Sequence, residues 1–342
     1  MAPPLLQVDN LRTYFQTPHG VSRAVDGVSF ELNSGETLAI VGESGCGKSI
    51  TALSILQLVP EPAGYIEGGR ILFAGSDLLD LTWNEMRAVR GKDIAMIFQE
   101  PTTSLNAVFT IGWQIMEAVT LHGTATGQEA QRRSIELLGK VGLSNPEAAM
   151  RQYPHELSGG MRQRAMIAIA LANNPKLLIA DEPTTALDVT IQAQILDLMK
   201  DLQQEFGMAI LMITHDLGIV ARMANDVAVM YAGQVVENAP TQELFREPKH
   251  PYTRGLFASL PTRARRGQDL ETLEGVVPQP TNWPAACRFE PRCSCRWATC
   301  ATVVPRYAAI TTPSPVRCHL YDPNIADRPA VSAKAREQVA TS

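Results

Sequence analysis

The chain contains Gly42-Glu43-Ser44-Gly45-Cys46-Gly47-Lys48-Ser49, with the strand-like run Thr37–Val41 before it and apolar residues at helical spacing after it. A glycine-rich loop that leads from a strand into a helix with this spacing is typical of phosphate binding. Its glycines let the backbone wrap closely, so that N–H groups and the positive end of the helix dipole face the phosphates. We expect Lys48 to reach the β- and γ-phosphates and the Ser49 hydroxyl to bind Mg²⁺, with the binding residues running from Gly42 to Ile50. A glycine-rich turn without a ligand is the alternative.

Two adjacent carboxylates follow another apolar strand-like run. Asp181 and Glu182 come directly after residues 177–180. Since ligands bind at the carboxyl ends of strands in α/β sheets, we expect Asp181 to bind Mg²⁺ and Glu182 to orient and deprotonate an attacking water. Such a pair is by itself often only a solvated turn. Together with the phosphate-binding loop, it favours hydrolysis of a nucleoside triphosphate.

The composition is that of a folded globular protein without a strong charge bias. The 342 residues include 30 Lys+Arg and 35 Asp+Glu, a net charge of −5, and 45% of them are hydrophobic. This balance disfavours nucleic acid as the main ligand. No run approaches the roughly 20 apolar residues of a membrane span, and the first residues do not resemble a secretory signal. We therefore expect a cytoplasmic protein.

Hydrophobic periodicity predicts an α/β fold. Strand-like runs at residues 5–11, 25–32 and 37–41 predict an N-terminal β portion, and residues 111–173 read as an inserted helical subdomain that begins near residue 100. Strands and helices then alternate over residues 177–231, which favours parallel βαβ units in a mixed sheet core. Beyond about Pro240 the sequence becomes rich in Pro, Arg and Cys. We expect a nucleotide-binding domain over residues 1–240, a small Cys-rich extension over 241–325 and a polar tail over 326–342.

A third motif, residues 157–164, places Ser158-Gly159-Gly160 at the start of a predicted helix. This is a second anion-binding helix terminus, which a simple kinase or GTPase does not need. The motif resembles the signature motif of ABC ATPases. The resemblance covers residues 5–240 and extends to Gln99 as the Q-loop glutamine, Ala186-Leu187-Asp188 as the D-loop, and His215 as the switch histidine.

The resemblance implies a mechanism shared between two subunits. In the family, two nucleotide-binding domains pack head to tail, and each ATP lies between one phosphate-binding loop and the partner's signature helix. Ser158-Gly159-Gly160 would then bind the γ-phosphate of the ATP held by the partner. Gln99 would bind Mg²⁺ and take part in catalysis, and His215 would contact the γ-phosphate of the ATP held by its own subunit. Phe15, or else Tyr14, stands where the family stacks an aromatic ring on adenine. One loop and one signature per chain imply pairing with a second copy or a related ATPase.

A finer resemblance is to the ATPases of oligopeptide, dipeptide and nickel importers, through residues 96–106, 181–195 and 250–256. Residues 91–98 resemble the D-type ATPase of such an importer, and the resemblance implies a peripheral position on the cytoplasmic face of the inner membrane. It implies import of di- or oligopeptides with two transmembrane permease subunits, which dock on residues 99–157, and an extracytoplasmic solute-binding protein. A nickel or metallophore importer is the alternative. A soluble ABC ATPase acting on nucleic acid or ribosomes is disfavoured, because residues 50–156 show no long coiled coil and only one cassette is present.

Five of the six cysteines lie near the C-terminal end: Cys287, Cys293, Cys295, Cys300 and Cys318. In a reducing compartment such a cluster favours metal binding over disulfides. Zinc sites usually present two C-x₂₋₄-C pairs, and the five cysteines do not form two such pairs. The importer resemblance implies a [4Fe–4S] cluster on Cys287, Cys293, Cys300 and Cys318, with Cys295 as an alternative ligand. Three other interpretations remain. The cysteines bind zinc, they bind no metal and the thiols pack as apolar groups, or they belong to a regulatory module that senses metal, redox state or solute.

Overall fold

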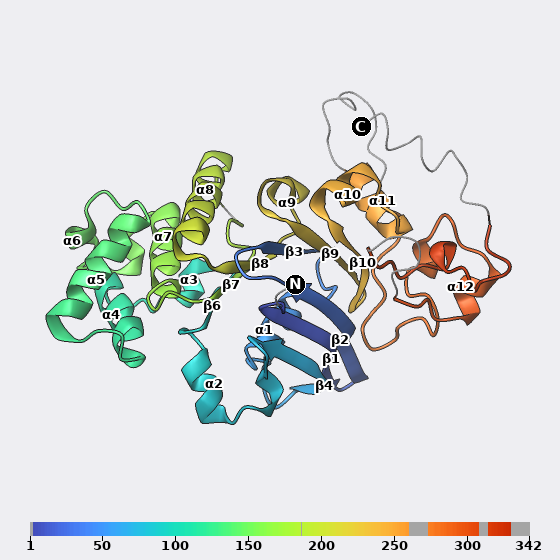
Figure 1. Cartoon of the computed structure of the whole chain (residues 1–342), viewed down its shortest axis with the longest axis horizontal. Helices are drawn as coiled ribbons and strands as arrows, with labels where there is room; N and C mark the ends of the chain where they lie inside the picture. Colours follow the sequence, from blue (N-terminus) through green and yellow to red (C-terminus); the bar gives the residue numbers. More distant parts are fainter. Residues whose placement is uncertain (1–2, 186, 260–272, 308–313, 330–342) are drawn as a thin grey trace. The chain divides into compact units, whose positions relative to one another are not determined.

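The computed structural model describes residues 3–185, 187–259, 273–307 and 314–329 (Figure 1). The chain divides into two compact units. The first unit consists of Met1–Leu6, Leu32–Thr37 and Leu72–Ile213. The second unit consists of Gln7–Glu31, Leu38–Ile71 and Thr214–Ser342.

The N-terminal β portion is built from long strands. Strands β2 (Gly20–Leu32), β1 (Leu6–Thr17) and β4 (Gly64–Phe73) are hydrogen-bonded neighbours in this order, and the short β5 (Ser76–Asp77) pairs antiparallel with the end of β4. Side chains along these strands alternate between buried and partly exposed, as expected of a sheet with one face on the core. The strands extend beyond the predicted runs because polar residues such as Thr13 continue the buried face of β1.

The second unit also contains the strands that hold the phosphate-binding loop. Strand β3 (Thr37–Val41) is buried throughout and pairs in parallel with β9 (Asp226–Tyr231), with Val41 opposite Val229. Strand β10 (Gln234–Pro240) pairs antiparallel with β9. The sheet is therefore mixed, as predicted. Helices α1 (Lys48–Ile55), α9 (Leu217–Met223), α10 (Thr241–Arg246) and α11 (Pro251–Ala258) belong to the same unit.

The first unit combines a parallel sheet with the predicted helical subdomain. Strands β6 (Ile94–Ile97), β7 (Leu177–Asp181) and β8 (Ala209–Ile213) pair in parallel, with Ile179 opposite both Met96 and Leu211. Helices α4 (Ile111–Leu121), α5 (Gly127–Lys140) and α7 (Gly159–Ala170) pack on one another (Figure 1). The unit also contains α2 (Trp83–Val89), α3 (Pro101–Ser104), α6 (Pro146–Ala149) and α8 (Val189–Phe206).

Strand β10 was not predicted from the sequence, because Glu237 interrupts its apolar pattern. The Glu237 side chain is 1% exposed and accepts hydrogen bonds from the backbone N–H groups of Lys249 and His250 at 2.7 and 2.9 Å. Burial raises the pKa of Glu237, and these bonds oppose that effect. A buried carboxylate with such partners is compatible with a strand, whereas the sequence pattern alone argues against one.

In the described residues from 273 onward, the helices of the second unit are short: η4 (Glu290–Arg292), α12 (Ala298–Thr302) and η5 (His319–Tyr321). Residues on either side of Val316 pair with β10: the Asn238 N–H donates to the Pro315 carbonyl at 3.0 Å and the Arg317 N–H to the Val236 carbonyl at 2.7 Å. The predicted domain limits at 240 and 325 stay predictions, and much of the polar tail lies outside the described residues. Within the described ranges, no helix is long and apolar enough to cross a membrane.

The buried His250 predicts an acid-sensitive fold. Its Nδ1 accepts the Tyr252 N–H at 3.0 Å and caps α11, and burial, with Arg254 and Arg317 nearby, lowers the pKa of His250 from 6.5 to about 3. Between these pH values the unfolded chain binds a proton at His250 that the folded chain does not bind. The free energy of unfolding therefore decreases by about 1 kcal/mol for each pH unit as the pH falls from 6.5 towards 3. Above pH 6.5 this group has no effect on it. We expect His250→Asn, which keeps a capping acceptor, to make Tm less dependent on pH between about 7 and 5. Tm is measured for both proteins across this range. Parallel curves for the two proteins would contradict this role.

Candidate nucleotide-binding site

The phosphate-binding loop lies between β3 and α1, as predicted. Its backbone passes so close to neighbouring backbone that side chains cannot be accommodated at two positions. A Cβ atom on Gly42 would lie 2.2 Å from the Met230 carbonyl oxygen, and one on Gly47 would lie 2.4 Å from the Ala24 carbonyl oxygen. Gly47 also has a φ of 108° at the N-cap of α1. The glycines therefore fix the loop against the second unit's strands.

Lys48 is held at the base of the loop. Its ammonium group donates to the carbonyl oxygens of Gly42 at 2.8 Å and Glu43 at 3.1 Å, and the residue is 6% exposed. Lys48 is the first residue of α1, so the lysine charge and the positive end of the helix lie together. Ser49 follows in the first turn of α1, whereas Ser44 and Gly45 at the tip of the loop are exposed. This arrangement is suited to binding a polyphosphate.

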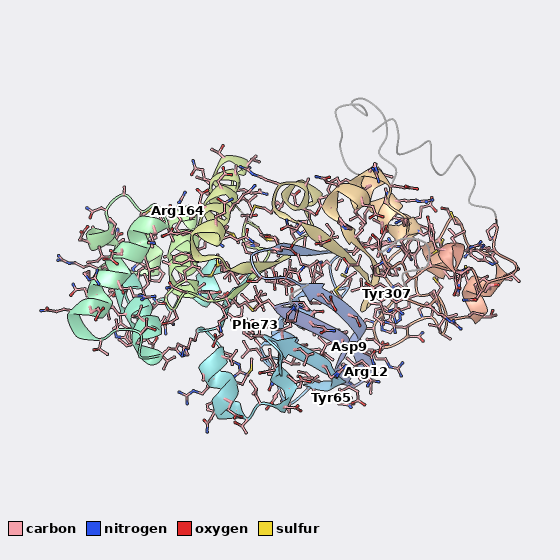
Figure 2. All side chains as sticks on the ribbon, in the orientation of Figure 1. Asp9, Arg12, Tyr65, Phe73, Arg164 and Tyr307 are labelled. Atoms are coloured by element: carbon pink, nitrogen blue, oxygen red, sulfur yellow. The ribbon has the colours of Figure 1, made fainter. Side chains whose placement is uncertain are left out.

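The two candidate adenine-stacking rings lie next to each other in β1. The Tyr14 hydroxyl donates to Asp26 at 2.7 Å, and burial together with this bond raises the pKa of Tyr14 to about 12. Tyr65, labelled in Figure 2, meets the Tyr14 ring edge-on at 6.2 Å. The Phe15 ring packs against Gly64, since a Cβ atom added to Gly64 would lie 2.6 Å from a carbon of the Phe15 ring. Tyr14 thus has a polar partner within the sheet, and the assignment of Phe15 to adenine stays a prediction.

The predicted catalytic carboxylate is joined to the Q-loop glutamine. Asp181 is the last residue of β7 and is buried, and Glu182 follows with a left-handed φ of 47°. The Glu182 Oε2 accepts from Gln99 Nε2 at 3.1 Å and from the Thr185 hydroxyl at 2.9 Å. The structure therefore brings Gln99 and Glu182 together in the first unit. The sequence analysis missed Thr185, although its position three residues after Glu182 in a turn is a signal for such a bond.

The signature motif forms a helix start that is accessible from outside. Ser158 is the N-cap of α7, and its hydroxyl accepts from the Met161 N–H at 3.3 Å. Ser158 and Gly159 are exposed and Gly160 is half-buried. Arg164, labelled in Figure 2, donates to the Val141 carbonyl at 2.6 Å and so ties α7 to the end of α5. The helix start is therefore presented on a fixed element.

The two remaining family motifs lie next to strand and helix ends. His215 is exposed in the second unit and follows Thr214, whose N–H donates to the Ile40 carbonyl at 3.2 Å. Asp188 of the predicted D-loop is the N-cap of α8 in the first unit. Ala186 lies outside the described residues.

Two residues beyond the motifs contact the phosphate-binding loop, and the sequence analysis assigned a role to neither. The Tyr252 hydroxyl accepts the backbone N–H of Glu43 at 2.9 Å. Arg292 donates to both oxygens of the Glu43 carboxylate, at 2.7 and 3.0 Å. The bond to Glu43 raises the pKa of Arg292, and burial raises that of Tyr252. Tyr252 lies in the 250–256 motif of the importer resemblance, but no spacing signal points to Arg292.

The five C-terminal cysteines do not form the predicted metal site. All five are described and are free thiols, and among the described residues no three His, Cys, Asp or Glu side chains are arranged to hold a metal ion. Burial raises the pKa of Cys287 to about 11 and that of Cys318 to about 12, whereas the bond with Cys293 lowers the pKa of Cys295 to about 6. The structure therefore gives no support to the iron–sulfur or the zinc interpretation.

Comparisons with known proteins identify the family. A family model described as "ABC transporter" matches residues 25–185, and one described as "Oligopeptide/dipeptide transporter, C-terminal region" matches residues 236–300. The chain belongs to the ABC transporter family, as an ATP-binding protein of its oligopeptide/dipeptide group. It is 54% identical over 318 residues to the oligopeptide transport ATP-binding protein AppD of Bacillus subtilis, covering 93% of this chain and 97% of AppD. It is 46% identical over 333 residues to the dipeptide transport ATP-binding protein DppD of the same organism, covering 97% of this chain and 99% of DppD.

Solved structures confirm the predicted ABC ATPase fold. A dimeric ATP-binding cassette in a post-hydrolysis state, bound to ADP and Pi, has a TM-score of 0.62 at 27% identity over 69% of this chain and 98% of that one. The cbiO1 protein of Clostridium perfringens, part of the ABC transporter complex cbiONQ, has a TM-score of 0.60 at 28% identity over 71% of this chain and 91% of that one.

Proposed function

We propose that this chain is the ATP-hydrolysing subunit that powers import of di- or oligopeptides through partner permease subunits. The observation that carries the proposal is the identity of 46–54% to oligopeptide and dipeptide transport ATP-binding proteins over almost the whole chain. The match of residues 236–300 to the oligopeptide/dipeptide C-terminal region supports the same group. No observation favours the nickel alternative or action on nucleic acid.

The phosphate-binding loop binds the nucleotide. Its backbone N–H groups and the Lys48 ammonium bind the β- and γ-phosphates, and Phe15 stacks on adenine. By the family resemblance, the Ser49 hydroxyl, the Gln99 amide oxygen and the Asp181 carboxylate would hold Mg²⁺, which prefers such hard oxygen ligands. The bound ion would neutralise part of the phosphate charge.

Glu182 deprotonates the attacking water. The bonds from Gln99 and Thr185 fix the orientation of its carboxylate, which takes the water proton as the oxygen attacks the γ-phosphorus. The bond from phosphorus to the β-phosphate oxygen then breaks, giving ADP and inorganic phosphate, while His215 stabilises the developing charge. Ser158, Gly159 and Gly160 bind the γ-phosphate held by a second ATPase subunit in a head-to-tail dimer.

The division of each site between two subunits predicts assembly-dependent activity. We expect weak MgATP hydrolysis by the purified chain alone and faster hydrolysis when the partner ATPase and the two permeases are present at the cytoplasmic face of the membrane. Phosphate release measured against protein concentration checks this, with the assembled complex as the reference. A monomer that hydrolyses ATP at the rate of the complex would contradict the shared site.

Transport itself decides the solute class. The complex, reconstituted in liposomes with its extracytoplasmic solute-binding protein, is expected to take up a labelled di- or oligopeptide at the expense of ATP. Uptake of Ni²⁺ in place of peptide would establish the alternative importer. The same preparation with Glu182→Gln is the control, because uptake that continues in this variant is not driven by this subunit.

A [4Fe–4S] cluster on Cys287, Cys293, Cys300 and Cys318, with Cys295 as the alternative ligand, rests on cysteine spacing and family resemblance alone. No step of ATP hydrolysis requires it, because hydrolysis transfers no electrons. Purification without oxygen followed by assays of iron and sulfide decides whether the chain carries a cluster. Protein without iron would remove the proposal and leave the ATPase function unchanged.

A further inference from the structure

Glu43, the second residue of the phosphate-binding loop, is held by three different groups. Its carboxylate accepts two hydrogen bonds from Arg292, at 2.7 and 3.0 Å. Its backbone N–H donates to the Tyr252 hydroxyl at 2.9 Å, and its carbonyl oxygen accepts from Lys48 at 3.1 Å. Two of these partners, Tyr252 and Arg292, come from the part of the chain beyond residue 240. This part of the chain therefore contacts the loop directly.

Arg292 reaches Glu43 from a fixed position. Its side chain is 4% exposed, against 29% for Glu43, and its Nε donates to the Glu274 carbonyl at 3.0 Å. The guanidinium carbon lies 5.7 Å from the centre of the Tyr231 ring. Tyr231 and Tyr252 both pack against Phe289, with ring centres 5.2 and 5.5 Å from it. Because Arg292 is anchored on several sides, its paired bonds hold the Glu43 carboxylate in one orientation.

A carboxylate in this loop opposes the binding of a polyphosphate. Glu43 carries the same sign of charge as ATP, and charges of like sign repel most strongly where water is partly excluded. The bidentate guanidinium compensates this charge and turns the carboxylate towards itself. We propose that Arg292 is a positioning residue for nucleotide binding, which neutralises and orients Glu43 so that the loop accepts MgATP. This inference rests on the proposed function, because it concerns the same nucleotide.

A positioning role for Arg292 differs from a merely structural role in one measurable respect. If Arg292 acts by compensating Glu43, then removing Arg292 harms binding only while Glu43 is charged. Replacing Glu43 with the neutral glutamine should therefore rescue the loss. A residue that only supports the fold would give no such rescue, since Glu43→Gln restores no packing.

The experiment measures the Kd of the full chain for MgATP by displacement of a fluorescent ATP analogue. We expect Arg292→Met to raise the Kd about tenfold, within the range for residues that tune a ligand site without touching the ligand. Arg292→Lys keeps the charge but loses the paired geometry, so we expect a smaller rise. The double variant Glu43→Gln/Arg292→Met should return to within about twofold of the wild type. In the assembled complex, Arg292→Met should raise the KM for ATP and leave kcat nearly unchanged.

The control variant is Arg296→Gln, in the same segment. Arg296 is 57% exposed and pairs at 3.5 Å with Glu290 rather than with the loop, so its replacement should leave the Kd unchanged. The Tm of every variant reports whether it folds. If Arg292→Met does not fold, Arg292→Lys takes its place in the comparison. A folded Arg292 variant with the wild-type Kd, or a double variant as weak as the single one, would overturn the inference. A wild-type chain that binds no MgATP would overturn the proposed function as well.

Discussion

Replacing Glu182 with glutamine is expected to slow ATP turnover by about 10²–10⁴-fold, the usual effect of losing a positioned general base. The amide cannot take the proton of the attacking water, whereas Lys48, Ser49 and Asp181 still hold MgATP. The variant should therefore bind MgATP with nearly the wild-type Kd. Single-turnover hydrolysis in the assembled complex measures the first effect, and nucleotide displacement on the full chain measures the second.

Thr185→Ala is the matched control for this prediction. It removes one hydrogen bond to Glu182, at 2.9 Å, but leaves the carboxylate and its bond to Gln99 in place. We expect a smaller loss of turnover than for Glu182→Gln, because the base is less well oriented but still present. Equal losses in the two variants would show that Glu182 is not the base.

Replacing Lys48 with alanine is expected to abolish tight nucleotide binding rather than to slow the chemical step. The variant loses an ammonium group that is buried at the base of the loop. Because charged hydrogen bonds contribute about 1.5–3 kcal/mol each, we expect the Kd for MgATP to rise by about 10- to 100-fold. The same displacement assay measures the change.

Lys176→Ala is the control, because Lys176 lies outside the phosphate-binding loop. Its side chain is 61% exposed and pairs with Asp93 at 3.0 Å, so we expect an unchanged Kd. If Lys48→Ala and Glu182→Gln bound MgATP equally weakly, the division between a binding lysine and a catalytic carboxylate would be wrong.

The elements that the sequence predicted most closely are those with one dominant signal. Strands β3 and β8 are buried along their whole length, and apart from Thr37 at the start of β3 their residues are all apolar. Helix α8 follows the N-cap Asp188 and has the C-cap Gly207 with a φ of 63°, and Asp before and Gly after a helix are common sequence signals of its limits. The family and its fold were also predicted, because the phosphate-binding loop and the signature motif are long and specific.

The contacts within the candidate site could not be predicted in the same way. Gln99 and Glu182 are 83 residues apart, and Glu43 and Arg292 are 249 apart. No local periodicity relates residues at such separations, since tertiary packing alone brings them together. The metal site inferred from the cysteines stays a prediction, because among the described residues no three His, Cys, Asp or Glu side chains are arranged to hold a metal ion.

Residues 315–317 pair with the outer strand β10 and so occupy backbone groups at its edge. An uncovered outer strand presents unpaired N–H and C=O groups to other molecules, which invites intermolecular strand pairing. Here the groups of Val236 and Asn238 are occupied by Arg317 and Pro315. We expect a chain shortened before residue 314 to expose this edge and to self-associate more readily.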